Sequence, residues 1–168
     1  MSGLLRNLLT LIQAVFASGR PDPWSRVSCY FWVSPFDCGT SVLKSDKYLQ
    51  LAEAAQLDFL VKTGLIGRMV RQGCRFVNAA QLVRFMKPIA MFKRVRVDTA
   101  VVYADERCAY FSHALFVRAQ LHGEVLVKMK FKSGQLTVRP ENMIGACPRG
   151  KPCHIQAWEQ ALAQMQKA

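Results

Sequence analysis

The sequence predicts an α+β domain in which one long, early helix packs against an antiparallel β-sheet. Residues 46–63 repeat apolar side chains at helical spacing, which predicts a helix with a broad buried face. Four later segments have the branched and aromatic composition of strands, at residues 76–85, 94–103, 108–119 and 124–132. The links between the last three segments are short, which favours antiparallel hairpins. Because such a sheet needs cover on one face, the helix is expected to cover it.

The composition favours one globular domain and excludes intrinsic disorder. The chain has 168 residues, of which 51% are hydrophobic and 20% charged, enough for a full core. Its net charge of +12 favours an anionic ligand or surface, because basic surfaces attract phosphate groups. The sequence has no nucleic-acid-binding motif and no block of basic residues, so no nucleic-acid partner is expected.

The six cysteines are mostly scattered through apolar segments, which suits reduced thiols and a cytoplasmic location. Cys147 and Cys153 are the exception, because they flank a Pro-Arg-Gly-Lys-Pro loop next to His154. A disulfide or a metal site is an alternative interpretation of this pair. A zinc site needs four ligands at tighter spacing and no second pair is present, so we expect incidental thiols and no metal.

Both ends of the chain are predicted to add helices to a central domain at residues 26–140. Residues 1–20 contain an amphipathic helix, whose apolar positions recur at helical spacing across residues 4–17. That helix is too short and too polar to span a bilayer. We interpret it as packed on the domain, with peripheral membrane contact as the alternative. Residues 141–168 form a loop and a last helix, at roughly 155–166.

Strand-ending and helix-capping residues predict the limits of the first strand and of the long helix. Residues 26–35 are rich in aromatic and branched side chains and end at Pro35, which predicts a strand. Ser45 is a plausible N-cap for the helix, and Asp46 suits the helix dipole in the first turn. Gly64 is the expected C-terminal stop.

Two of the later strands alternate clearly, which predicts the residues that face the core. In the strand at 94–103 every second residue is expected to share a face, namely Val95, Val97, Thr99, Val101 and Tyr103. In the strand at 124–132 the corresponding set is Val125, Val127, Met129 and Phe131. The same alternation places Asn78 and Gln81 on opposite faces of the strand at 76–85.

A run of motifs between residues 33 and 65 resembles a known family. The motifs are Val33-Ser34-Pro35-Phe36-Asp37-Cys38-Gly39, then Tyr48-Leu49, then Glu53, then Thr63-Gly64-Leu65. In this order they resemble the 4-hydroxybenzoyl-CoA thioesterase-like group of hotdog-fold proteins. The apolar segment at 4–16 is similar to the N-terminal helix of the branch that includes thioesterase superfamily member 6. The resemblance implies a hotdog fold, a long central helix wrapped by an antiparallel sheet.

The resemblance also implies where a thioester would be attacked. In the family, the second aspartate of a D-x-D motif is the nucleophile or base, and amides at the helix start polarise the carbonyl. Here Asp37 matches the first aspartate, Gly39 occupies the second position, and residues 43–46 replace the family's H-M-N-N segment. The candidate carboxylates are Asp37, which leads, then Asp46 and Glu53. For Asp37 the alternative is an aspartate that caps the turn through its backbone amides. The candidate oxyanion donors are the amides of Ser45, Asp46 and Lys47.

Five further residues are candidates for substrate binding, namely Cys38, Gly39, Tyr48, Asn78 and Gln81. Cys38 is also a candidate acyl acceptor, since a thiolate attacks thioesters readily when its pKa is lowered. Asn78 and Gln81 carry amides that could hydrogen-bond a ligand, although an edge or dimer contact is the preferred interpretation.

Two functional hypotheses follow. The first is a hydrolase of acyl-CoA or acyl-carrier-protein thioesters, with acyl-CoA as substrate and no cofactor. The alternative is a catalytically degenerate hotdog protein that binds an acyl thioester or a protein partner without turnover. Because a hotdog sheet leaves one edge free, a homodimer or a dimer of dimers is expected.

Overall fold

The computed structural model describes residues 19–165, so the helix predicted at residues 4–17 lies outside the described residues. A six-stranded antiparallel sheet dominates this part of the chain, with strand order β1-β3-β4-β5-β2 and with β6 paired to β5. The strands are β1 Val27–Trp32, β2 Arg75–Phe85, β3 Arg94–Ala104, β4 Ala109–Val117, β5 Gln120–Ser133 and β6 Leu136–Val138. The helices are the 3-10 turn η1 Pro35–Asp37, then α2 Ser45–Lys62, α3 Leu65–Arg71, α4 Glu141–Ile144 and α5 Cys153–Met165.

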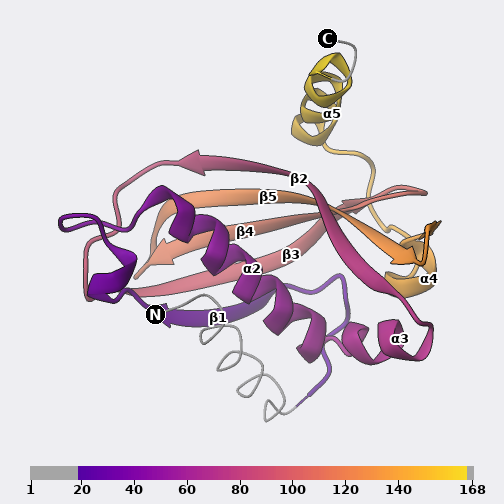
Figure 1. The fold of residues 1–168 in the computed structure, drawn as a ribbon, viewed down its shortest axis with the longest axis horizontal. Coiled ribbons are helices and arrows are strands. Elements are labelled where there is room, and N and C mark those ends of the chain that lie inside the picture. Colours follow the sequence, from indigo (N-terminus) through magenta and orange to yellow (C-terminus); the bar gives the residue numbers. More distant parts are fainter. Residues whose placement is uncertain (1–18, 166–168) are drawn as a thin grey trace.

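Helix α2 lies across the inner face of the sheet, as the hotdog resemblance implies (Figure 1). Its alanines Ala52, Ala54 and Ala55 are buried, which lets the helix approach the strands closely. Phe59 packs edge-to-face on Phe111 of β4, with ring centroids 5.5 Å apart. The predicted helix and sheet are therefore confirmed.

The ends of α2 differ from the prediction at one residue. Gly64 has φ +73, the left-handed conformation that ends a helix, as expected. At the other end the N-cap is Lys44 rather than Ser45, and no side chain caps the helix. Ser45 is already helical, so its hydroxyl is not placed to accept from the first-turn amides.

The predicted core faces of β3 and β5 are confirmed except at Tyr103, and two β-bulges explain the differences at Tyr103 and in β2. In β3 the register shifts between Val101 and Tyr103, so Tyr103 pairs with Tyr110 on the outer face instead of sharing the core face of Val101. In β2 it shifts between Asn78 and Ala80. Asn78 then lies opposite Met129 and Gln81 opposite Val127, two core residues, so Asn78 and Gln81 share the inner face.

Helix α5 packs on the outer face of the sheet, the face that α2 leaves free. Ile155 and Trp158 are buried there with Tyr110 and Leu126, and Tyr103 packs against this second core. The predicted last helix is thus confirmed, whereas α3, α4 and β6 were not predicted. No helix among the described residues is long and apolar enough to cross a membrane.

Candidate active site

Asp37, the leading sequence candidate, is buried in the turn between β1 and α2. Its Oδ2 accepts hydrogen bonds from the hydroxyl of Ser34 at 2.6 Å and from the amide of Ser34 at 3.1 Å. The side chain is only 3% exposed, and the two residues form a reciprocal capping box around η1. This geometry holds the carboxylate on the turn that it stabilises.

The same turn lies directly against the start of α2. The carbonyl of Asp37 accepts a hydrogen bond from the Lys44 amide at 3.0 Å. In the described part of the chain, the amides of Ser45 and Asp46 make no hydrogen bond, while Lys47 N–H donates to the Lys44 carbonyl. These two first-turn amides can therefore donate hydrogen bonds to a negatively charged oxygen, aided by the helix dipole.

Cys38 and Gly39 follow Asp37 and have opposite exposures. Cys38 is buried, and its backbone forms an isolated antiparallel β-bridge with Leu43. Burial, and to a smaller extent the negative charge of Asp37, raises the pKa of its thiol. A thiol that stays protonated is a poor acyl acceptor. Gly39 lies in an exposed turn, and a Cβ built on it would meet nothing within 4 Å.

Tyr48 is buried and packs α2 against the far edge of the sheet. Its ring meets Phe85 edge-to-face at 4.9 Å, and its hydroxyl donates to the Lys87 carbonyl at 3.4 Å. It lies so close to β5 that a Cβ on Gly123 would be 2.9 Å from the ring. Tyr48 therefore positions α2 on β2 and β5, whatever contact it makes with a substrate.

A polar row lies between α2 and β2, on the inner face of the sheet. Gln56 of α2 is 1% exposed, and its Nε2 donates to Asn78 Oδ1 of β2 at 3.1 Å. Its Oε1 is buried and has no hydrogen-bond partner in the described part of the chain. Gln81 shares the face of Asn78 and is exposed.

Glu53 belongs to this row because it precedes Gln56 by three residues, which places the two side chains on neighbouring positions of one helix face. Glu53 is exposed and forms no ion pair among residues 19–165. Asp46, in contrast, lies at the exposed helix start, where it accepts from Gln50 at 3.4 Å and pairs with Lys47 at 3.7 Å. Of the three carboxylates, Glu53 is the one that is open and unpaired in this part of the chain.

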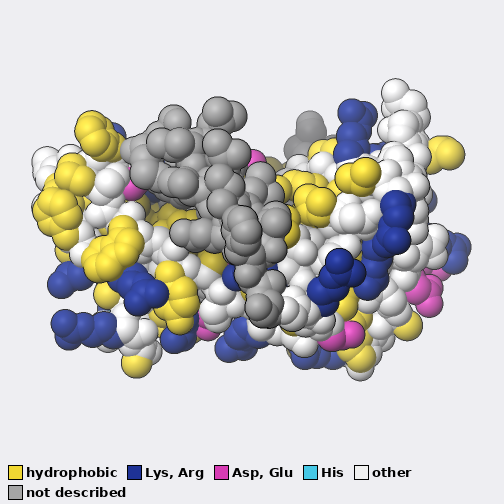
Figure 2. Space-filling view, turned by 90° about the horizontal axis from the view of Figure 1, so that it is seen from below, with side chains coloured by type: hydrophobic (Ala, Val, Ile, Leu, Met, Phe, Trp, Pro, Cys, Tyr) yellow, Lys and Arg dark blue, Asp and Glu magenta, His cyan; other side chains and the backbone are white. Residues whose placement is uncertain are grey.

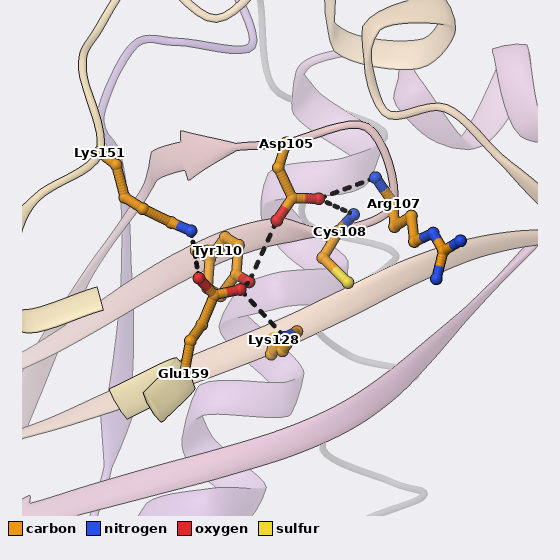
Figure 3. Close-up of polar contacts among 7 residues, drawn as sticks. All are labelled: Asp105, Arg107, Cys108, Tyr110, Lys128, Lys151 and Glu159. Atoms are coloured by element: carbon orange, nitrogen blue, oxygen red, sulfur yellow. Dashed lines mark hydrogen bonds and ion pairs between the residues drawn. The ribbon is translucent and has the colours of Figure 1, made fainter. Parts of the chain in front are cut away.

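A second polar cluster lies on the outer face, where α5 crosses the sheet (Figure 3). Glu159 of α5 accepts hydrogen bonds from Tyr110, Lys128 and Lys151, and the same Tyr110 hydroxyl lies 3.2 Å from Asp105 Oδ2. Burial alone would raise the pKa of Glu159, but these three donors outweigh it and lower the pKa to about 2. Every oxygen of Glu159 has a donor, so this cluster anchors α5.

Sequence reasoning missed Ser34, Gln56 and the Glu159 cluster. Gln56 could have been noticed in the sequence, because it is a polar residue within the apolar helix face formed by Ala52, Ala55 and Phe59. The Glu159 cluster left no such signal, since its members come from segments far apart in the sequence.

A long helix on the inner face of a curled antiparallel sheet, with its candidate site at the helix start and along the helix, defines a hotdog domain. The chain belongs to the thioesterase-like superfamily, whose model matches residues 39–158.

Solved structures share this fold at low sequence identity. A probable thioesterase from Escherichia coli is 12% identical with a TM-score of 0.65, covering 70% of this chain and 98% of that chain. A DHNA-CoA thioesterase from Staphylococcus aureus is 15% identical with a TM-score of 0.61, covering 84% and 91%. The 4-hydroxybenzoyl-CoA thioesterase of a Pseudomonas species is 12% identical with a TM-score of 0.61, covering 68% and 92%.

Proposed function

We propose that this chain hydrolyses acyl thioesters of coenzyme A or of an acyl-carrier protein, with Glu53 as the catalytic carboxylate. The observation that carries the proposal is the contrast between the two carboxylates. Asp37 is buried and accepts two hydrogen bonds from Ser34, whereas Glu53 is exposed and lies three residues before Gln56, which contacts Asn78. A general base must reach a water molecule, and only the second environment offers that access.

The reaction assigns one task to each part of the site. Glu53 takes a proton from water, and the resulting hydroxide attacks the thioester carbonyl carbon. The amides of Ser45 and Asp46 stabilise the oxyanion of the tetrahedral intermediate. The C–S bond then breaks, and the thiolate of the carrier leaves and takes the proton back from Glu53, which restores the Glu53 carboxylate and yields the free acid and thiol. Asn78 and Gln81, on the inner face of β2, supply amides for the acyl carrier.

The two tasks fall to different protomers in this proposal. Ser45 and Glu53 are eight residues apart on one helix, roughly 12 Å at 1.5 Å per residue, which is too far for one thioester carbonyl. Two copies of α2 that lie side by side in opposite directions would bring the start of one helix next to Glu53 of the other. The family resemblance, which implies active sites between protomers, supports this arrangement.

Strand β2 is the proposed dimer edge. It pairs only with β5 among the described strands, and it exposes the apolar side chains Val77 and Leu82. An exposed apolar edge strand is a template for pairing with a second copy. The double variant Val77→Lys with Leu82→Lys is expected to be monomeric in analytical ultracentrifugation and to lose turnover at the same time. The same measurement on the wild type would reveal a dimer of dimers.

The test is release of free thiol from a panel of acyl-CoA and acyl-carrier-protein substrates. Wild type is expected to turn over at least one substrate, and Glu53→Gln to lower kcat by about 10²–10⁴ while leaving the fold and KM nearly unchanged. Glu106→Gln, an exposed glutamate on the β3–β4 turn, is the matched control. A Glu53→Gln variant that retains full turnover would overturn the assignment.

A second candidate function, ligand binding without turnover, is favoured by Gly39. This residue occupies the position at which the family carries its second aspartate. The open space around Gly39 means that Gly39→Asp should fold normally. If wild type binds coenzyme A saturably but releases no thiol, and Gly39→Asp gains turnover, the chain is a binding protein that has lost its catalytic carboxylate.

A further inference from the structure

An aromatic and basic patch lies at the end of the domain where β1 finishes. Trp32, Phe36 and Phe92 are 70%, 79% and 67% exposed, and Lys93 and Arg94 lie beside them in the sequence. Figure 2 looks at the molecule from the side of β1 and shows hydrophobic and basic side chains gathered at this end. We refer to these five residues as the aromatic–basic patch.

Backbone hydrogen bonds hold the patch together. Trp32 is paired with Arg94 in the β1–β3 ladder. Beyond the ladder, the Phe92 amide donates to the Val33 carbonyl at 2.9 Å, and the Val33 amide donates to the Lys93 carbonyl at 3.0 Å. Phe36 follows directly in η1. The residues that carry the exposed rings therefore lie on neighbouring backbone segments joined by hydrogen bonds.

Phe92 is held in an unfavourable conformation. Its φ is +61, in the left-handed region that a bulky side chain rarely adopts, and its ring is nevertheless exposed to water. The Phe92 amide is hydrogen-bonded to Val33, but the ring is 67% exposed. A strained residue with an exposed ring indicates a functional constraint, and the nearby Trp32 and Phe36 are exposed as well.

The exposed charged residues of the segments that carry these rings are basic. Segments 32–44 and 87–96 carry five basic residues, Lys44, Lys87, Lys93, Arg94 and Arg96, of which Arg96 is paired with Asp98 at 3.0 Å. Asp37 is the acidic residue of segment 32–44, and it is buried against Ser34. Arg94 stacks over the Tyr30 ring at 4.2 Å, and Lys93 with Arg118 and His122 lines an open hollow of about 680 Å³. The patch therefore combines exposed aromatic rings, which suit an apolar phase, with basic side chains, which suit anionic phosphate groups.

A second copy of the chain is a poor occupant for this surface. The patch lies at the β1 side of the sheet, and β2, the proposed dimer edge, is the strand at the opposite edge. Two such patches brought face to face would also repel each other, because both are basic.

We propose that the aromatic–basic patch docks the domain on an anionic lipid surface. Trp32, Phe36 and Phe92 enter the interfacial region, and Lys93 and Arg94 contact the lipid phosphates. This proposal rests on described residues alone, and it stands whether or not the chain hydrolyses thioesters.

The test is co-sedimentation of the full chain with vesicles of phosphatidylcholine containing about 30% phosphatidylglycerol, compared with pure phosphatidylcholine. Wild type is expected to bind the anionic vesicles, and to bind them more weakly at high salt.

The double variant Trp32→Ser with Phe92→Gly should weaken binding about tenfold or more. Glycine suits the positive φ at position 92, so this variant should fold. Lys93→Gln with Arg94→Gln should weaken binding about fivefold per charge. Val70→Ser with Leu136→Ser, two residues each 75% exposed elsewhere, is the matched control and should bind as wild type.

A fluorescence measurement locates the contact. On vesicle binding, the emission of Trp32 should shift to the blue, and Trp32→Phe should lose that shift while Trp24 and Trp158 remain. The proposal is overturned if the anionic vesicles do not bind, or if binding survives the patch variants and is lost only when residues 1–18 are deleted. It is also overturned if the patch variants change the sedimentation of the protein alone, which would assign the surface to a second copy.

Discussion

The two faces of the sheet hold their helices by different forces. On the inner face, α2 is held by apolar packing through Ala52, Ala55 and Phe59, all almost fully buried. On the outer face, α5 buries only Ile155 and Trp158 and adds the charged contacts of Glu159. Apolar packing depends little on pH, whereas the contacts of Glu159 depend on its charge.

The polar groups of the two faces differ in the same way. Glu159 is saturated with donors from Tyr110, Lys128 and Lys151, which suits an anchor. The inner row is incompletely satisfied, because Gln56 Oε1 is buried without a partner in the described chain and Glu53 is open. Buried polar groups without partners cost stability, and they are retained most readily where a ligand uses them. The comparison therefore supports our proposal that the chemistry belongs to the inner face, and it gives the outer cluster a structural role.

The largest expected effect comes from breaking the inner face. Phe59→Ala removes a ring that is fully buried against Phe111, and it should lower the free energy of unfolding by about 3–5 kcal/mol in urea titrations. Trp158→Ala is the outer-face counterpart. It should release α5 while the sheet still unfolds cooperatively at nearly the wild-type midpoint. Equal loss of global stability in both variants would contradict the comparison.

Acid should weaken the inner face through His113. Burial lowers the pKa of His113 from 6.5 to about 3, and Nδ1 contacts Thr99 Oγ1 at 2.9 Å. The unfolded chain binds a proton below about pH 6.5 while the folded chain does not, so stability is full above that pH and is lost as the pH falls towards 3. The loss at pH 4 should be about 3 kcal/mol.

Urea titrations at pH 7, 5 and 4 measure this loss in the wild type. His113→Leu with Thr99→Val removes both polar partners and should flatten the pH dependence. His154→Leu, at an exposed histidine, should leave the dependence as in the wild type. An unchanged slope in the His113 variant would show that other groups cause it.

A smaller and local effect is expected on the outer face. Glu159→Gln removes the charge that faces Lys128 and Lys151, and it should lower the local stability of α5 by about 1–2 kcal/mol. In the wild type the same contribution is present above about pH 4.5 and is lost as the pH falls towards 2, because the folded-state pKa is depressed. Hydrogen exchange of α5 amides at neutral pH measures the change, and Gln160→Glu in the same helix is a control for the substitution itself.

Sequence periodicity predicted the elements well, since the alternation of β5 and the helical spacing of α2 are local properties. It failed at Tyr103, Asn78 and Gln81, because a bulge depends on how the partner strand pairs and not on the strand's own pattern. It also assumed that Ser45 caps α2, although the chain enters the helix through Lys44.

The candidate site was predicted in part for the same reason. The motif order located Asp37, Cys38 and the start of α2, and one hydrogen bond joins the Asp37 carbonyl to the Lys44 amide at the N-cap of that helix. The sequence could not show that Ser34 donates two hydrogen bonds to the Asp37 carboxylate. An aspartate in a capping box and a free catalytic aspartate have the same local sequence pattern. Nor could it pair Gln56 with Asn78, which are 22 residues apart.

The central claim is that Asp37 stabilises the turn while Glu53 performs the chemistry. The most direct measurement compares Asp37→Asn and Glu53→Gln for both thermal midpoint and thiol release per folded molecule. The account predicts a lower midpoint with turnover within about threefold of wild type for Asp37→Asn, and an unchanged midpoint with at least a 10²-fold loss of kcat for Glu53→Gln. The reverse pattern, a stable but inactive Asp37→Asn and an active Glu53→Gln, would contradict it.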